Sequence, residues 1–255
     1  ADEKGDTPLF AAVHQGRDAC VRLLLAHPDV YVNQANIKGD TPLVTGAYMG
    51  RDACVQLLMA RPDVDVNMVN AQGYTPLHAA ILHGRDACVQ LLLAHPNVDV
   101  NLANKQGLTA LGTAACLGRD PYVQQLLAHP DVNMAGHNGL CPLSCSMMGN
   151  IDEAKLRCCI LLLASQRVPA GHIGAAIRFV RKQPATETRS LALRVLISER
   201  KGHRRWCAYC YAVSSGKQTC SLCAGCRQVG YCSPDHQRAH WRAAHKQECT
   251  AKGPP

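Results

Sequence analysis

GDTPLF at residues 5–10, GDTPLV at 39–44, GYTPLH at 73–78 and GLTALG at 107–112 recur at a constant spacing in a chain of 255. An altered fifth copy, GLCPLS, follows at 139–144, after a slightly shorter interval. Two further motifs recur with the same period: GRDACV, first at 16–21, and HPDVYVN at 27–33, which returns as RPDVDVN at 61–67 and HPNVDVN at 95–101. Self-similarity at a fixed period of this length is typical of proteins that stack one supersecondary unit many times. The first two thirds of the chain are therefore predicted to form a repeat structure.

Each repeat contains the signals for two helices and a projecting turn. Thr7 can cap a helix that has Pro8 at its first position, where no N–H group is missed. Gly16 suits the left-handed residue that ends a helix, and Asp18 places a carboxylate at the positive end of a second helix. Pro28 ends that helix, and residues 33–39 then form the turn. These signals predict a mainly α-helical solenoid of helix-turn-helix units.

The repeat resembles the ankyrin repeat, whose unit is roughly 33 residues long and carries a T-P-L-H signature. The resemblance covers residues 1–168, which would hold about five repeats, and only the third copy keeps the full signature, at Thr75–His78. Cys141 replaces the capping threonine in the fifth copy, which we expect to be the least regular. Ala1 falls inside a predicted turn, and terminal repeats need a polar outer face. We therefore expect the natural protein to continue upstream.

Residues 169–202 contain two further helical patterns, GHIGAAIRFVRKQ and TRSLALRVLISERK, which are separated at Pro184. Ile173 and Ile177 belong to a loosely apolar face of the first pattern. Two interpretations remain open for this segment. It forms either a degenerate last repeat that closes the stack or an independent linker.

The composition changes near residue 200. Residues 1–199 carry 17 Lys and Arg against 17 Asp and Glu, whereas residues 200–255 carry 10 against 2, so the whole formal charge of +8 lies in the last fifth. Both tryptophans and 7 of the 15 cysteines are also there. This change predicts a separate small module at residues 203–250, followed by a short tail at 251–255.

Four close pairs of cysteine and histidine occupy this module. Each pair can supply half of a tetrahedral zinc site. A disulfide framework is the competing interpretation, and it fits poorly with an odd number of cysteines and with repeated isolated cysteines upstream. The pairs are Cys207 with Cys210, Cys223 with Cys226, Cys232 with His236 and His245 with Cys249.

The spacing of these pairs, with Tyr231, Gln237 and Trp241 in register, resembles the MYND zinc finger over residues 207–249. Members of that family interleave their ligands, so the resemblance implies two structural Zn²⁺ ions in a small zinc-stabilised module. Each ion would have four protein ligands and no open position for a substrate. By the resemblance, the first zinc takes Cys207, Cys210, Cys232 and His236, and the second takes Cys223, Cys226, His245 and Cys249.

His236 departs from the family pattern, which usually has a cysteine at this position. Imidazole is an accepted zinc ligand, and the spacing of His236 and His245 places the two on opposite faces of a helix. They would therefore reach different ions. His240 and Cys220 remain rival ligands, since Cys220 also forms a C-x2-C pair with Cys223.

An ankyrin stack presents a concave surface and a row of turn tips, and the residues expected there vary while the rest of the repeat stays constant. Such variation suits a surface that recognises a partner protein, although a merely solvated surface is the alternative for any single residue. The candidates are His14, Gln15, Tyr48, Met49, Leu82, His83, Cys116 and Leu117 on the helices, and Gln34, Asn36, Lys38, Asp40, Asn70, Gln72, Tyr74, Asn104, Lys105, His137 and Asn138 at the tips.

The resemblance to MYND fingers implies a second binding site, for a proline-containing peptide with a Pro-x-Leu core. By that resemblance Gln237 and Trp241 contact the peptide. They are one helical turn apart and can share a face. The alternative is that Trp241 belongs to the small core of the module.

The remaining features argue against other functions. Cys20, Cys54 and Cys88 recur at one apolar position of the repeat, which predicts packing in the core and not a catalytic nucleophile. The basic tail motivates nucleic-acid binding, but six zinc-bound thiolates with two Zn²⁺ lower its charge to about +6. No apolar run approaches the roughly 18 residues of a membrane span.

The sequence therefore predicts a non-catalytic scaffold or adaptor for protein–protein interactions, with unidentified proteins on the ankyrin surface and a proline-containing peptide on the finger. The alternative is a non-catalytic part of a larger enzyme, or a transcription regulator that contacts nucleic acid through the basic tail. Isolated cysteines indicate a reducing compartment, which is the cytosol or the nucleus.

Overall fold

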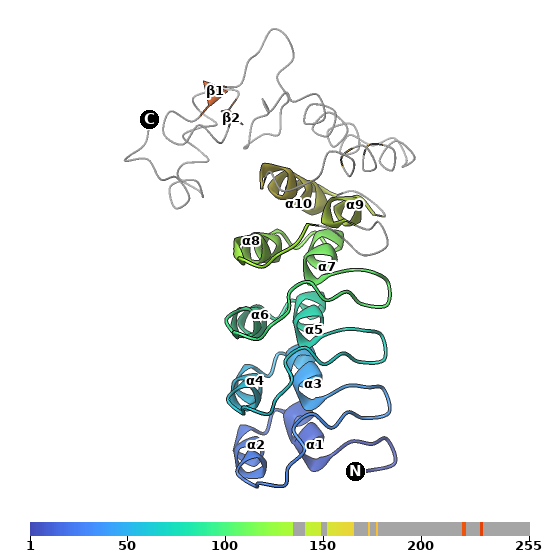
Figure 1. The fold of residues 1–255 in the computed structure, drawn as a ribbon, viewed down its shortest axis with the longest axis vertical. Helices are drawn as coiled ribbons and strands as arrows, with labels where there is room; N and C mark the ends of the chain where they lie inside the picture. Colours follow the sequence, from blue (N-terminus) through green and yellow to red (C-terminus); the bar gives the residue numbers. More distant parts are fainter. Residues whose placement is uncertain are drawn as a thin grey trace, which may run out of the picture.

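Helices stand in pairs along one axis in the computed structural model, which describes residues 1–134, 141–148, 152–165, 173, 177, 221–222 and 230–231 (Figure 1). The first helices of the repeats form an inner row and the second helices an outer row, and loops project beside the inner row. The helices are α1 (Pro8–Gln15), α2 (Asp18–Leu25), α3 (Pro42–Met49), α4 (Asp52–Met59), α5 (Pro76–His83), α6 (Asp86–Leu93), α7 (Ala110–Cys116), α8 (Asp120–Ala128), α9 (Pro142–Ser146) and α10 (Glu153–Ala164).

The predicted threonine caps are present in the first four repeats. The Thr7 side chain accepts a hydrogen bond from the backbone N–H of Phe10 at 3.1 Å, and Thr41, Thr75 and Thr109 do the same in their repeats. In the fifth repeat the Cys141 thiol takes this role and accepts from the Ser144 N–H at 3.4 Å. That repeat has the shortest helix of the stack described here, with five residues, which agrees with its expected irregularity.

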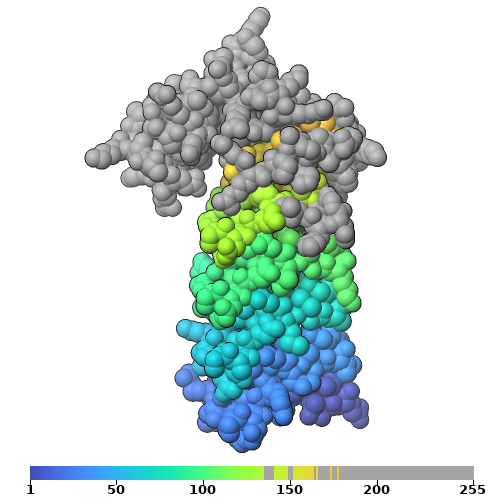
Figure 2. Space-filling model, in the orientation of Figure 1, coloured from blue at the N-terminus to red at the C-terminus, as the bar shows by residue number. Residues whose placement is uncertain are grey.

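The core runs through the whole stack. Successive inner helices pack on one another from α1 to α9, so leucines at one repeat position form a continuous buried row: Leu9, Leu43, Leu77, Leu111 and Leu143. Figure 2 shows the successive repeats as bands along the long axis. Each repeat is therefore stabilised mainly by the repeats on either side of it.

One predicted core residue is not in the core. Cys54 and Cys88 are fully buried, but Cys20 at the equivalent position is exposed. The prediction for Cys20 was wrong because α2 belongs to the first repeat, and within the described residues no earlier outer helix covers that side of it. Position within the repeat predicts the residue type, whereas the neighbouring repeat determines its burial.

The far end of the stack is covered in part by residues from the segment at 169–202. Ile173 and Ile177 are both helical, are only 8 % and 2 % exposed, and belong to the same core cluster as the repeats. This packing favours the closing-repeat interpretation at these two positions. The rest of the segment, including Pro184, lies outside the described residues.

Two short strands are described in the C-terminal region. β1 (Ser221–Leu222) and β2 (Gly230–Tyr231) pair antiparallel, with Ser221 opposite Tyr231 and Leu222 opposite Gly230. No described helix is long and apolar enough to cross a lipid bilayer.

Candidate protein-binding surface and candidate metal centre

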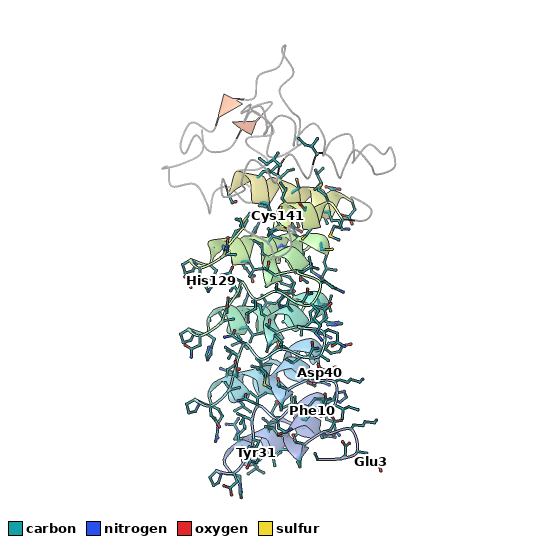
Figure 3. The ribbon with its side chains drawn as sticks, turned by 45° about the vertical axis from the view of Figure 1, so that its right-hand side comes forward. Glu3, Phe10, Tyr31, Asp40, His129 and Cys141 are labelled. Carbon is teal, nitrogen blue, oxygen red and sulfur yellow. The ribbon has the colours of Figure 1, made fainter. Side chains whose placement is uncertain are left out.

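A groove runs along the inner helices of the first three repeats. It lies between α1, α3 and α5 on one side and the projecting tips on the other, and its cavity volume is about 820 Å³. Figure 3 shows Glu3, Phe10 and Asp40 on the side of the stack that carries the tips. The lining residues are Lys4, Asp6, Phe10, Ala11, His14, Gln15, Asn36, Ile37, Lys38, Asp40, Val44, Thr45, Tyr48, Met49, Asn70, Gln72, Tyr74, Ala79 and Leu82.

Most of the predicted surface residues of the first three repeats line this groove. His14, Gln15 and Tyr48 are exposed at the ends of α1 and α3. The sequence missed Lys4 and Asp6, although both stand one full repeat before the predicted residues Lys38 and Asp40. Extending every candidate position through all repeats would have found them.

Other predicted surface residues lie outside the groove or outside the described residues. His83, Cys116, Leu117, Gln34 and Lys105 are at least partly exposed but do not line the groove. His137 and Asn138 fall in the part of the chain that the structure does not describe.

An asparagine in the second and in the third tip fixes the tip and links it to the preceding repeat. The Oδ1 atom of Asn36 accepts hydrogen bonds from two backbone N–H groups of its own tip, those of Lys38 at 2.9 Å and Asp40 at 3.0 Å. Its Nδ2 atom donates to the carboxylate of Asp6 at 3.0 Å. Asn70 repeats this arrangement with Asp40, at 2.9 Å. These asparagines are therefore structural as well as groove-lining.

Asn104 contradicts the prediction of an exposed tip residue, since its side chain is only 5 % exposed. Its Oδ1 atom accepts from two backbone N–H groups of its own tip. Its Nδ2 atom is buried without a partner among the described residues, because Tyr74 stands where Asp6 and Asp40 accept in the earlier repeats. An unsatisfied buried amide costs about 1–3 kcal/mol.

Replacing Tyr74 with aspartate should supply the missing acceptor. We expect Tyr74→Asp to have a higher free energy of unfolding than Tyr74→Ala by about 1–2 kcal/mol, because only the carboxylate can accept from Asn104. Urea unfolding followed by circular dichroism measures the difference, and the alanine variant accounts for loss of the ring. Equal stability of the two variants would show that the amide is already satisfied.

The histidine of the complete signature is buried and has a structural role. His78 is 1 % exposed. Its Nε2 lies 3.0 Å from the carbonyl oxygen of Leu108, which can only accept, so Nε2 carries the proton and Nδ1 accepts from the Thr75 hydroxyl at 2.8 Å. Burial lowers the pKa of His78 to about 4, with the Leu108 hydrogen bond opposing. The neutral imidazole thus joins the third repeat to the fourth.

This burial predicts a dependence of stability on pH. Between pH 6.5 and 4 the unfolded chain protonates this imidazole and the folded chain does not, so the free energy of unfolding falls as the pH falls. We expect His78 to contribute about 1–3 kcal/mol to this loss. Urea titrations of wild type and His78→Gln at pH 7 and pH 4.5 measure it, since the variant lacks this contribution. The same pH dependence in both proteins would refute the assignment.

Thiols link successive outer helices. The Sγ atoms of Cys54 and Cys88 donate to the carboxylates of Asp18 and Asp52 in the preceding repeats, each at 2.9 Å. Burial, followed by the hydrogen-bonded carboxylate, raises the pKa of Cys54 to about 12, and the same two causes raise the pKa of Cys88. Thiols that remain protonated in this way are poor nucleophiles, which agrees with the predicted packing role.

In the later repeats the aspartate equivalent to Asp18 and Asp52 accepts from donors other than cysteine. The Tyr122 hydroxyl donates to Asp86, and Arg157 forms an ion pair with Asp120 at 3.3 Å. The first-turn aspartate of the outer helix, which the sequence identified as a helix-start signal, therefore also receives a donor from the next repeat.

The three equivalent cysteines should differ in reactivity. With iodoacetamide at mildly alkaline pH we expect Cys20 to be alkylated in the native protein, and Cys54 and Cys88 to remain unmodified because they are buried and protonated. Peptide mass spectrometry locates the modified residues, and alkylation of all three in urea provides the control. Native labelling of Cys54 at the rate of Cys20 would contradict the hydrogen-bonded arrangement.

The predicted zinc ligands and the peptide contacts Gln237 and Trp241 lie outside the described residues, so their assignment remains a prediction. Among the residues that are described, no group of side chains could hold a metal ion. The pairing of Leu222 with Gly230 joins the two ends of the segment that carries Cys223 and Cys226, and Cys232 directly follows Tyr231. Thiols and imidazoles are the donors that zinc prefers, so the donor set fits this metal.

The helical pairs, projecting tips and cysteine-rich tail define a repeat protein with a zinc-binding module. The family described as ankyrin repeats (3 copies) matches residues 1–70, 28–104 and 55–136, which together span more than half of the chain. The chain therefore belongs to the ankyrin repeat family. The MYND finger family matches residues 207–249, so the chain also carries a C-terminal MYND finger, a zinc-binding module.

Known proteins are similar over parts of the chain. It is 31 % identical to mouse (Mus musculus) "Programmed cell death protein 2" over 97 residues, which are 37 % of this chain and 27 % of that protein. The ankyrin repeat protein EF0377 has 19 % identity and a TM-score of 0.63, covering 78 % of this chain and 98 % of its own. An ankyrin repeat domain from Acinetobacter baumannii AYE has 21 % identity and a TM-score of 0.63, covering 75 % and 97 %. The two structures share the fold.

Proposed function

We propose that this protein is a non-catalytic adaptor that binds one protein in the groove of its ankyrin stack and a second through its MYND finger. Ankyrin repeats and MYND fingers are protein-interaction modules. The observation that carries the proposal is the groove, because its lining changes between repeats while the framework stays constant. His14, Tyr48 and Leu82 stand at one repeat position, above threonine caps that are identical in all three repeats. Constant packing with variable lining suits specific recognition of one partner.

The MYND finger would bind a proline-containing peptide through Gln237 and Trp241, with two structural Zn²⁺ ions maintaining its fold. Zinc that has four protein ligands leaves no position for a substrate, which supports a binding role. The cytosol or the nucleus would be the site of action, because Cys54 and Cys88 serve as hydrogen-bonding thiols, and a reducing compartment keeps thiols in this form.

Affinity capture with the full chain tests whether the groove and the finger bind different proteins. Tyr48→Ala removes a groove residue that is 46 % exposed, and Tyr31→Ala removes a tyrosine that is 79 % exposed and lies outside the groove. We expect Tyr48→Ala to lose one set of partners and Trp241→Ala, with unchanged zinc content, to lose a different set. Tyr31→Ala should keep both sets.

If the two tyrosine variants lost the same partners, the groove would not be the binding site. If Trp241→Ala kept every partner while its zinc content stayed unchanged, the proposed peptide contact of the finger would be wrong.

A further inference from the structure

We infer that the groove binds an acidic segment of its partner in an extended, polyproline II-like conformation, with one acidic side chain opposite Lys4 and one opposite Lys38. This inference rests on the proposed function of the groove and specifies the chemistry of its partner. It follows from the lysines at the groove rim, from the carboxylates already engaged beneath them, and from the distance between repeats.

Two exposed lysines stand at equivalent positions on the rim. Lys4 and Lys38 line the groove, and neither forms an ion pair within the described residues. Their backbones are fixed, because the carbonyl oxygens of Lys4 and Lys38 accept hydrogen bonds from the N–H groups of Ile37 and Ala71, each at 3.0 Å. Both tips are thereby held in register, and each ammonium group remains free to pair with an acid of a ligand.

The carboxylates of the groove belong to the framework. Asp6 and Asp40 are half-buried and accept hydrogen bonds from Asn36 and Asn70 at 3.0 and 2.9 Å. Asp6 and Asp40 balance the formal charge of Lys4 and Lys38. The lysine side chains are nonetheless exposed, whereas the two carboxylates are half-buried and hold the tips together. Lys4 and Lys38 are therefore the exposed charged side chains among the groove-lining residues, and acidic side chains are their natural partners.

The distance between repeats selects the conformation of the segment. Packed helices lie about 8–10 Å apart, so Lys4 and Lys38, at equivalent positions of neighbouring repeats, are expected to be about 8–10 Å apart. A polyproline II chain rises about 9.3 Å in three residues and returns to the same face. A β-strand presents the same face every second residue, after about 6.7 Å. Two acids three residues apart therefore match Lys4 and Lys38, and Gln72, a neutral donor, stands at the equivalent position of the third repeat.

The groove also offers contacts for the residues between the acids. Tyr48 is 46 % exposed, and its ring packs on the His83 ring with centroids 3.9 Å apart, which holds it in place. Ile37 is 73 % exposed beside Lys38. These side chains give the segment an apolar surface within reach of both charged positions.

Short synthetic peptides on a proline-free serine–glycine background provide the probes, since proline would also engage the finger. One peptide carries two glutamates three residues apart, a second carries glutamine at both positions, and a third of equal length carries its two glutamates two residues apart, the spacing of one face of a β-strand. Affinity for the full chain is measured by fluorescence anisotropy at low and at physiological salt. We expect the first peptide to bind most tightly and to weaken as salt rises.

Charge-neutralising variants locate the contact. Lys4→Gln and Lys38→Gln should each weaken the first peptide about two- to fivefold, as expected for exposed ion pairs. Lys105→Gln is the matched control, because Lys105 is an exposed tip lysine that does not line the groove. It should leave the affinity within about twofold.

Three results would overturn the inference: equal affinity of the glutamate and glutamine peptides, equal affinity of the two glutamate spacings, or an equal effect of Lys105→Gln and Lys38→Gln. Absence of binding by every peptide would also overturn it. The proposed adaptor function would then still be judged separately, by the dependence of capture on Tyr48 and Trp241.

Discussion

Removal of zinc is expected to unfold the C-terminal finger and to leave the ankyrin stack folded. A segment as short as residues 203–250 rarely buries enough apolar surface to fold alone, and in small metal-binding modules the free energy of metal binding is the free energy of folding. The stack depends instead on a buried row of leucines and on hydrogen bonds between repeats. With a chelator, we therefore expect limited proteolysis to cleave after residue 202 while most of the helical circular dichroism signal remains.

Metal analysis of the purified full chain should find two zinc ions per chain. Cys223→Ser should lower this number, because Cys223 is a predicted ligand, whereas Cys220→Ser should leave it at two. The two substitutions are chemically identical and lie close together in the chain, so they distinguish the assigned register from its rival. One zinc ion in the wild-type chain, or loss of zinc in Cys220→Ser, would refute the assignment. Loss of the helical signal with the chelator would refute the independence of the stack.

The inner helices of the first three repeats could be predicted from the sequence because their signals are local. A threonine cap, a proline at the first helical position and a glycine after the last turn act within a few residues, and all of them appear where the motifs place them. Burial could not be predicted in this way, because it depends on the adjacent repeat. Cys20 and Cys54 occupy the same position, yet of these two only Cys54 has an earlier outer helix beside it in the described structure.

The lining of the groove could be predicted in part, from the repeat period. The repeat period identifies which positions vary, and those positions include many of the lining residues. The repeat period does not identify which tip side chains form hydrogen bonds between repeats and are therefore unavailable to a ligand. Asn104 shows this limit, since the loss of its acceptor depends on Tyr74, which belongs to the preceding tip. Which polar and charged tip side chains are free to bind a ligand can therefore be determined only from the three-dimensional structure.

Leu77→Ala is expected to destabilise the stack as a whole. Leu77 is 1 % exposed in α5, and α5 packs against both α3 and α7, so the cavity would lie between neighbouring repeats. Leucine-to-alanine changes in cores cost about 2–5 kcal/mol, and we expect a loss in this range in urea unfolding. Leu23→Ala is the same substitution at a site that is 75 % exposed, so it should change the free energy of unfolding by less than about 0.5 kcal/mol. Similar losses in both variants would mean that the leucine row does not hold the repeats together. A second, separate transition in Leu77→Ala alone would show that coupling between neighbouring repeats is weaker than their packing indicates.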